Sequence, residues 1–301
     1  MSEWSGVAGK RVLITGATSG IGLAAAKELS RRGALLSIVA RSEQRGQRAL
    51  AEIGAGASAD LVIADLSLQR SIRELASELL ARYERVDVLI NNAGAMFSRR
   101  ELTSEGFERT WALNHLGPFL LTTLLLDRLR ESAPARVITT SSDAHRGVRR
   151  LPFDDLDAAN SYRRLGFARY SETKLANILF TAELARRLEG SGVGAYCLHP
   201  GLVASGFNRN NGPMMDSAMR LLRPFSRTPE RGAQTLVWLA DTSETLADGG
   251  YYVDERLRKL SPAALDMQAA ARLWELSEQQ TDVADARTEQ QRARPRDLDA
   301  S

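Results

Sequence analysis

Tyr170 and Lys174 have the residue types and the spacing of an acid–base pair. An interval of four residues places both side chains on one face of a helix, one turn apart. A nearby ammonium group favours tyrosinate, so Lys174 is expected to lower the pKa of Tyr170 from about 10 toward neutrality. A phenol with such a pKa can exchange a proton with a substrate oxygen. The same spacing also arises by accident on helix surfaces, so the rest of the sequence must decide.

A glycine-rich turn near the N-terminus indicates where a second reactant would bind. The apolar segment 11–15 is expected to be a strand, and a helical pattern covers residues 21–32. Between them, Gly16, Gly20 and Gly22 permit a tight turn and a close approach to a pyrophosphate, which helix N-terminal amides would bind. The spacing G-x-x-x-G-x-G differs from the fingerprint G-x-G-x-x-G, and a plain strand-to-helix connection is the alternative.

With these two motifs the chain resembles the short-chain dehydrogenase/reductase family, whose glycine turn is Thr-Gly-x-x-x-Gly-x-Gly and whose active site contains Tyr-x-x-x-Lys. Further motifs follow in the family's order: Asn91-Asn92-Ala93-Gly94, Asn114, Ser141-Ser142 and His199-Pro200-Gly201. The resemblance covers about residues 8 to 255. Asn114 to Thr122, Ser141 to His145 and Leu175 to Phe180 resemble the retinol-dehydrogenase-like branch of the family.

Hydride transfer between a nicotinamide and a carbonyl carbon needs a proton donor, for which Tyr170 is suited. Ser142 is expected to hold the substrate oxygen, as a donor aimed at developing negative charge. The resemblance further implies that Lys174 binds the nicotinamide ribose and that Asn114 joins Lys174 to a chain of water molecules. The residues expected at the cofactor are Gly16, Thr18, Ser19, Gly20, Ile21, Gly22, Arg41, Asp65, Leu66, Asn92, Ala93, Gly94, Tyr170, Lys174, Pro200, Gly201, Val203 and Ser205.

The end of the second predicted strand indicates which dinucleotide binds. Folds that prefer NAD usually carry Asp or Glu about 20 residues past the glycines for the ribose 2′-hydroxyl, whereas Arg suits a 2′-phosphate. Here the strand ends with Val39-Ala40-Arg41-Ser42, without an acid. We therefore expect NADP, with Arg41 on the phosphate and Arg45 assisting. A solvated Arg41 is the alternative, and Asp65, expected at the adenine, is alternatively a helix N-cap.

Short apolar strands alternate with amphipathic helices along the chain. Strands are expected near 11–15, 35–40, 60–64, 86–91, 136–141, 194–199 and 250–253, and helices at 21–32, 43–53, 68–83, 105–130, 168–189 and 229–241. This alternation predicts a doubly wound α/β Rossmann fold, with helices on both faces of a mostly seven-stranded parallel sheet. We expect one domain over residues 1–280 and a polar, disordered tail over 281–301.

Composition excludes several classes of function. The chain has 301 residues, 44% of them hydrophobic, and a net charge of +3 with interspersed charges, which disfavours nucleic acid as a partner. Cys197 is the only cysteine and the three histidines lack metal-ligand spacing, so neither a disulfide nor a metal site is expected. Without a signal peptide or an apolar span, we expect a cytoplasmic protein with at most weak peripheral membrane contact.

Two segments are expected to shape the substrate site. The connection from Ser142 to Tyr170 holds Leu151, Pro152, Phe153 and Phe167, which favour a lipophilic or ring-bearing substrate. Segment 204–228, where methionines alternate with arginines, is expected to form a mobile lid. A buried helix and a membrane-touching amphipathic helix are the alternatives. Helices 105–130 and 168–189 form a dimer or tetramer seam in the family, although their apolar faces also suit a core.

The sequence therefore predicts an NADP-dependent oxidoreductase, an alcohol dehydrogenase or carbonyl reductase, acting on a lipophilic or ring-bearing small molecule. One alternative is reduction of a carbon–carbon double bond, as in the related protochlorophyllide reductases. The other is a non-catalytic, NADP-binding regulatory or scaffold protein.

Overall fold

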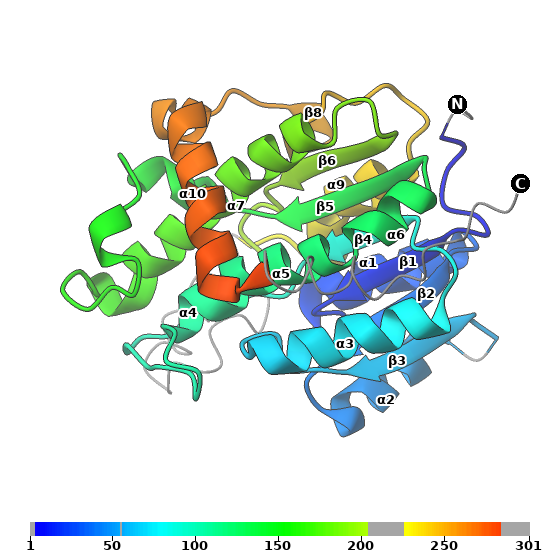
Figure 1. Cartoon of the computed structure of the whole chain (residues 1–301). Helices are drawn as coiled ribbons and strands as arrows, with labels where there is room; N and C mark the ends of the chain where they lie inside the picture. The colour runs from blue at the N-terminus through cyan, green and yellow to red at the C-terminus, as the bar shows by residue number, and fades with distance from the viewer. Residues whose placement is uncertain (1–3, 55, 204–225, 284–301) are drawn as a thin grey trace, which may run out of the picture.

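An eight-stranded sheet forms the centre of the computed structural model, which describes residues 4–54, 56–203 and 226–283 (Figure 1). Its order is β3-β2-β1-β4-β5-β6-β7-β8, and all pairs are parallel except β7 with β8. The strands are β1 (Arg11–Thr15), β2 (Leu35–Ala40), β3 (Ala59–Ile63), β4 (Val88–Asn91), β5 (Ala135–Thr140), β6 (Val193–Leu198), β7 (Tyr251–Val253) and β8 (Arg256–Leu257). The predicted doubly wound sheet is confirmed, with an added antiparallel hairpin.

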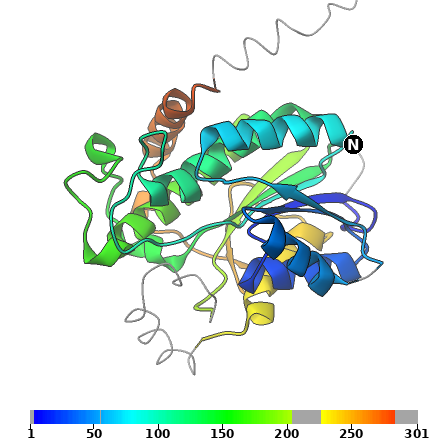
Figure 2. The same cartoon turned by 90° about the horizontal axis from the view of Figure 1, so that it is seen from below.

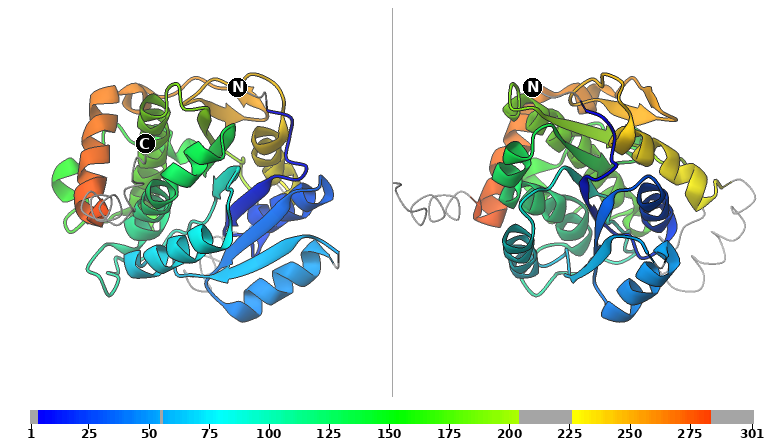
Figure 3. Two further views of the ribbon diagram at one scale, coloured as in Figure 1. Left: turned by 45° about the vertical axis from the view of Figure 1, so that its right-hand side comes forward. Right: turned by 90° about the vertical axis from the view of Figure 1, so that its right-hand side faces the viewer.

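Helices cover both faces of this sheet (Figure 2). One face carries α1 (Gly20–Arg31), α2 (Glu43–Ile53) and α9 (Pro229–Asp241), and the other carries α3 (Gln69–Arg82), α5 (Gly117–Leu124), α6 (Leu126–Glu131) and α7 (Phe167–Arg187) (Figure 3). Alternate side chains of β1 serve both cores, since Val12 and Ile14 pack with α1 and α9, whereas Leu13 packs with α3 and α5. The sheet is therefore buried on both sides, as parallel sheets require.

The helix predicted over 105–130 is broken into pieces. It begins with α4 (Arg109–Trp111), widens into a π-turn (Ala112–Leu116) and continues as α5 and α6. Pro118 has no N–H to donate to the carbonyl of Asn114, so the ordinary helical ladder cannot pass this point. Instead the Gly117 N–H reaches back five residues to the Ala112 carbonyl. The interruption falls on Asn114, one of the predicted site residues.

A C-terminal helix, α10 (Met267–Thr281), is absent from the sequence prediction. The Asp266 side chain caps it by accepting the Ala269 N–H at 2.9 Å. Its buried face, which includes Leu273 and Trp274, lies across α7 (Figure 1). Among the described residues, no helix combines the length and apolar character needed to cross a bilayer. Residues 204–225 of the lid predicted over 204–228, Ser205 among them, and residues 284–301 of the tail predicted over 281–301 lie outside the described residues. Of the remainder, Thr228 caps α9 and Thr281 ends α10.

Candidate active site

A cavity of about 1080 Å³ opens at the carboxyl ends of the central strands. It lies where the strand order reverses between β1 and β4, the usual ligand position in a doubly wound sheet. All of the predicted cofactor residues that the structure describes line this cavity: Gly16, Thr18, Ser19, Gly20, Ile21, Gly22, Arg41, Asp65, Leu66, Asn92, Ala93, Gly94, Tyr170, Lys174, Pro200, Gly201 and Val203. The motifs are therefore brought together although they are far apart in sequence.

The glycine turn is packed tightly against the turn that follows β4. A Cβ atom on Gly22 would lie 2.2 Å from the Gly16 carbonyl oxygen and 2.6 Å from Asn92 Nδ2, so only glycine fits. Thr15 Oγ1 accepts the Asn92 N–H at 2.9 Å and the Ala93 N–H at 3.0 Å. The side chain of Ser19 does not cap α1, which leaves the first amides of that helix for a ligand. This cradle fits a pyrophosphate.

Arg41 and Arg45 also line the cavity, and both are exposed. Among the described residues, no carboxylate forms an ion pair with Arg41. Asp65 does not cap α3; its Oδ1 accepts the N–H and the hydroxyl of Ser67 at 2.9 and 2.6 Å. The Arg41 guanidinium, which has no carboxylate partner among the described residues, and the turn that carries Asp65 therefore both line the cavity. This arrangement fits the adenosine end of a dinucleotide phosphate.

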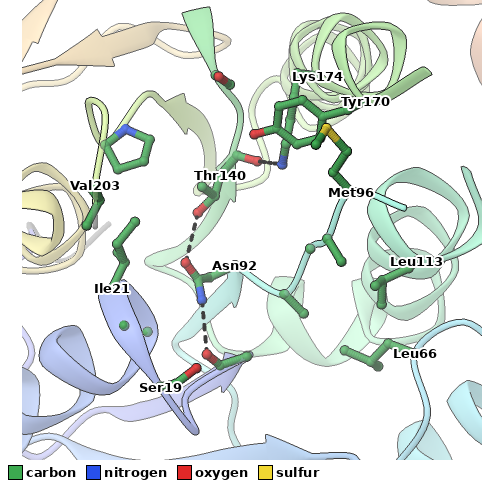
Figure 4. Close-up of a pocket in the computed structure, with 18 of the residues that line it drawn as sticks. Ser19, Ile21, Leu66, Asn92, Met96, Leu113, Thr140, Tyr170, Lys174 and Val203 are labelled. Atoms are coloured by element: carbon green, nitrogen blue, oxygen red, sulfur yellow. Dashed lines mark hydrogen bonds between the residues drawn. The ribbon is translucent and has the colours of Figure 1, made fainter. Parts of the chain in front are cut away.

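Tyr170 and Lys174 project from α7 to the end of β5 (Figure 4). Lys174 Nζ donates to the Thr140 carbonyl at 2.9 Å and lies 5.4 Å from the centroid of the Tyr170 ring. Ser142 hydrogen-bonds the Tyr170 hydroxyl. The neighbouring Ser141 hydroxyl instead donates to the Lys174 carbonyl at 2.7 Å, which fixes α7 against β5. The chemistry-bearing groups thus meet at the carboxyl end of one strand.

The expected pKa shift of Tyr170 is wrong for this structure. Burial raises the pKa of Tyr170 to about 12, and the hydrogen bond from Ser142 opposes that rise. Burial also lowers the pKa of Lys174 to about 8. Both groups are driven toward their neutral forms because a low-dielectric site disfavours any charge. Spacing alone could not reveal this, since it says nothing of desolvation.

Asn114 lies behind the cavity wall rather than on it. Its Oδ1 accepts the Ala95 N–H at 2.9 Å, and its Nδ2 donates to the Ala95 carbonyl at 2.8 Å and to Thr173 Oγ1 at 3.1 Å. Gly94 separates the amide from the lysine, because a Cβ there would lie 3.2 Å from Asn114 Oδ1 and 3.5 Å from Lys174 Nζ. The π-turn therefore presents Asn114 to the strand end that carries Gly94.

The apolar end of the cavity differs from the prediction. Phe167 lines it as expected, but Leu151, Pro152 and Phe153 do not; Leu151 is buried in a core cluster against which Phe153 packs. The sequence reading missed Met96, Phe97, Leu165 and Leu202, which do line the cavity. Met96 and Phe97 directly follow the Asn-Asn-Ala-Gly motif, and that proximity was the available signal.

A buried charge network lies under the start of α7. The side chains of Arg169 and Glu108 have no exposed surface, and Arg169 Nε lies 2.7 Å from Glu108 Oε2. Arg169 also pairs with Glu172 at 3.2 Å, donates to the Leu156 carbonyl and lies 4.7 Å from the Trp111 ring. Glu108 caps α4 through the Thr110 and Trp111 N–H groups. The residue next to Tyr170 thus joins α7, α4 and the connection before α7.

The chain is similar in sequence to several known proteins of one family. A family model described as short chain dehydrogenase matches residues 10–151. Retinol dehydrogenase 12 from Bos taurus is 46% identical over 274 residues, which cover 89% of this chain and 85% of that protein. DnrU, a candidate daunorubicin C-13 ketoreductase from Streptomyces sp. (strain C5), is 43% identical over 275 residues, covering 90% and 92%.

One of the solved structures similar to this chain contains NADP. RhlG from Pseudomonas aeruginosa, in an active-site complex with NADP, is 28% identical and superposes with a TM-score of 0.66, covering 83% of this chain and 96% of that one.

Proposed function

Because the chain belongs to the short-chain dehydrogenase/reductase family of NAD(P)-dependent oxidoreductases, we propose that it transfers a hydride between NADP and the carbonyl or alcohol carbon of a lipophilic or ring-bearing small molecule. One observation carries this proposal. Tyr170, Lys174 and Ser142 lie in the same cavity as the glycine turn, so a substrate oxygen and a dinucleotide can meet there. The geometry also suits Ser142 rather than Ser141, whose hydroxyl is already donated to the main chain.

A nicotinamide bound in this cavity would supply the hydride in reduction and accept it in oxidation. As a carbonyl oxygen gains negative charge, Tyr170 donates its phenolic proton to it. A pKa of about 12 keeps this proton in place at neutral pH, ready for the reductive direction. Ser142 Oγ accepts the Ala144 N–H at 3.2 Å, and its own proton, which is directed to Tyr170 when no substrate is present, can instead donate to the same substrate oxygen.

Lys174 has two roles in this proposal. With Nζ bonded to the Thr140 carbonyl, the ammonium retains two further hydrogens for the hydroxyls of a ribose. Its positive charge stabilises the tyrosinate that forms when Tyr170 gives up its proton. Asn114, held by Ala95 and Thr173, fixes the turn at Gly94 beside this lysine.

The preference for NADP rests on Arg41. The two residues directly after β2 are Arg41 and Ser42 rather than an acid, and the exposed Arg41 guanidinium in the cavity lining suits a 2′-phosphate. The NADP bound by RhlG supports the same choice.

The substrate class rests on the apolar wall. Met96, Phe97 and Phe167 offer a surface for a hydrophobic or aromatic ligand. Retinol and daunorubicin, the compounds in the names of two relatives, both carry rings.

The decisive test is a cofactor titration followed by a carbonyl panel. Fluorescence should show tighter binding of NADPH than of NADH, and NADPH should then be oxidised by ring-bearing aldehydes or ketones. Tyr170→Phe should lower kcat by roughly 10²- to 10⁴-fold while NADPH binding survives, because the ring stays and the proton is lost. Comparable turnover by this variant would remove Tyr170 from the mechanism. A product with a reduced carbon–carbon bond and no new hydroxyl would favour the double-bond reductase.

A further inference from the structure

The turn after β6 is joined to the turn after β5 by a histidine. His199 Nδ1 accepts the main-chain N–H of Asp143 at 3.3 Å, and His199 Nε2 lies 3.7 Å from Asp143 Oδ2. Asp143 directly follows Ser142, and His199 directly precedes Pro200. Since Ser142 and Pro200 both line the cavity, the imidazole bridges the proposed substrate-oxygen donor and the turn expected at the nicotinamide.

The carboxylate that faces this histidine is itself fixed. Asp143 Oδ1 accepts the Tyr251 hydroxyl at 2.9 Å and the Arg146 Nε–H at 3.2 Å. The Tyr251 ring on β7 is fully buried, so its hydroxyl cannot easily follow a moving partner. His199 therefore meets an acceptor whose position is set by the neighbouring strand.

The opposite side of the same turn is clamped as well. The Arg227 N–H donates to the Leu202 carbonyl at 2.7 Å, and Arg227 Nη2 lies 3.1 Å from Asp254 Oδ2. Gly201 has φ +83°, and a Cβ there would lie 2.7 Å from Arg227 Cδ and Nε. The turn is therefore held between the Arg227–Asp254 ion pair and the His199–Asp143 contact, and of these groups only histidine ordinarily changes its charge on the acid side of neutrality.

The hydrogen bonds define which nitrogen of His199 carries the proton. Because Nδ1 accepts a main-chain N–H, the neutral ring is protonated on Nε2, which points toward the Asp143 carboxylate. A second proton would place an N–H at Nδ1 against the N–H of Asp143, and this hydrogen bond would be lost. Burial lowers the pKa of His199; Arg227 and His145 act in the same direction, whereas Asp143 and Asp254 oppose it.

We propose that His199 is a positioning residue for hydride transfer: the neutral imidazole holds the Ser142 turn against the Pro200–Gly201 turn, and protonation releases this arrangement by removing the hydrogen bond from the Asp143 N–H, which leaves only attraction between the imidazolium and the Asp143 carboxylate. This inference rests on the proposed function and assigns a role to a residue that does not itself exchange a proton with substrate. Misplacing a reacting group by about 1 Å can cost roughly a hundredfold in rate, so release should lower kcat more than it weakens cofactor binding.

The test compares His199→Asn with His199→Leu, two side chains that have the same number of heavy atoms and the same branching at Cγ. The Asn amide oxygen can replace Nδ1 as acceptor for the Asp143 N–H but cannot be protonated near neutrality. With NADPH and a carbonyl substrate, His199→Asn should keep a kcat near the wild-type value at pH 8 and lose the acid-side decline caused by His199. His199→Leu should lower kcat by roughly ten- to a hundredfold across the pH range, with little change in the Kd of NADPH.

Equal kcat values for the two variants, or an unchanged acid limb in His199→Asn, would overturn the role of His199. Nitrogen-15 NMR of the histidine rings gives a readout that needs no turnover. It should show neutral His199 with its proton on Nε2 and a pKa below the ordinary histidine value. The opposite tautomer would overturn the inference even if no substrate is found, whereas absence of NADPH binding and of carbonyl reduction with the expected tautomer would count against the proposed function alone.

Discussion

The two ends of the cavity are held by different kinds of interaction. At the cofactor end, the turns after β1 and β4 are joined mainly by main-chain groups and by the small side chains of Thr15 and Asn92. At the substrate end, the turns are joined by ionisable side chains: the ion pairs of Glu108 with Arg169 and of Arg227 with Asp254, and the contact of His199 with Asp143. The first end depends on where glycine is allowed, and the second depends on pairs formed across long sequence separations.

The largest effect on stability is expected from a substitution at the substrate end. Arg169→Met should lower the free energy of unfolding by about 3–5 kcal/mol, because it leaves Glu108 buried without its partner. Denaturant unfolding monitored by circular dichroism measures this. The double variant Glu108→Gln with Arg169→Met should recover part of the loss, since the Gln side chain can still cap α4.

Thr15→Val is the matched variant at the cofactor end. It removes the hydroxyl that accepts the Asn92 and Ala93 N–H groups and should cost about 1–3 kcal/mol. If Thr15→Val proved more destabilising than Arg169→Met, the contrast between the two ends would be wrong.

An intermediate effect is expected at Arg41. Arg41→Asp should raise the Kd of NADPH by roughly ten- to a hundredfold, the contribution of one or two charge-assisted hydrogen bonds, and leave NADH binding unchanged or improved. Fluorescence titration of both cofactors measures the ratio. An unaltered preference would remove Arg41 from the phosphate role, while an Arg48→Asp control, at an arginine outside the cavity lining, should change neither Kd.

The smallest effect sharpens the boundary of the substrate wall. Phe167 lines the cavity and is 46% exposed. Phe167→Ala should raise KM for a lipophilic carbonyl by roughly fivefold, because about 1 kcal/mol of apolar contact is lost. Phe153→Ala is the control, because Phe153 packs on the core cluster. It should lower thermal stability and leave KM in place. The reverse pattern would restore Phe153 to the substrate wall.

The sequence predicts features set by local backbone requirements better than features set by pairs of distant residues. The strand positions and the glycine turn were readable because apolar runs and Gly16 to Gly22 reflect local backbone demands. The seven parallel strands occur within two residues of their predicted positions. The cofactor residues followed from the family motifs, and those that the structure describes do lie in one cavity.

The remaining features depend on contacts that no local pattern encodes. The π-turn at Asn114 arises at Pro118, whose missing N–H interrupts a segment that otherwise has the continuous apolar pattern of one helix. The buried Arg169 was unexpected because arginine is rarely buried and its partner Glu108 is distant in sequence. The predicted direction of the Tyr170 pKa shift was wrong because the tyrosine loses its contact with water only when the surrounding chain is folded.

The helix α10 bears on how copies of this chain can meet. Trp274 stacks on Phe180 of α7 at 5.9 Å between ring centroids, and Arg187 lies 4.3 Å from the Trp274 ring. His115 adds a hydrogen bond to Ser277 at 2.9 Å. This part of α7 is therefore already occupied within one chain, and an identical neighbour that used it would have to displace α10. Any self-association that leaves the fold intact must therefore use a different surface. The C-terminal helix covers, within one chain, a surface that a second subunit would otherwise bind.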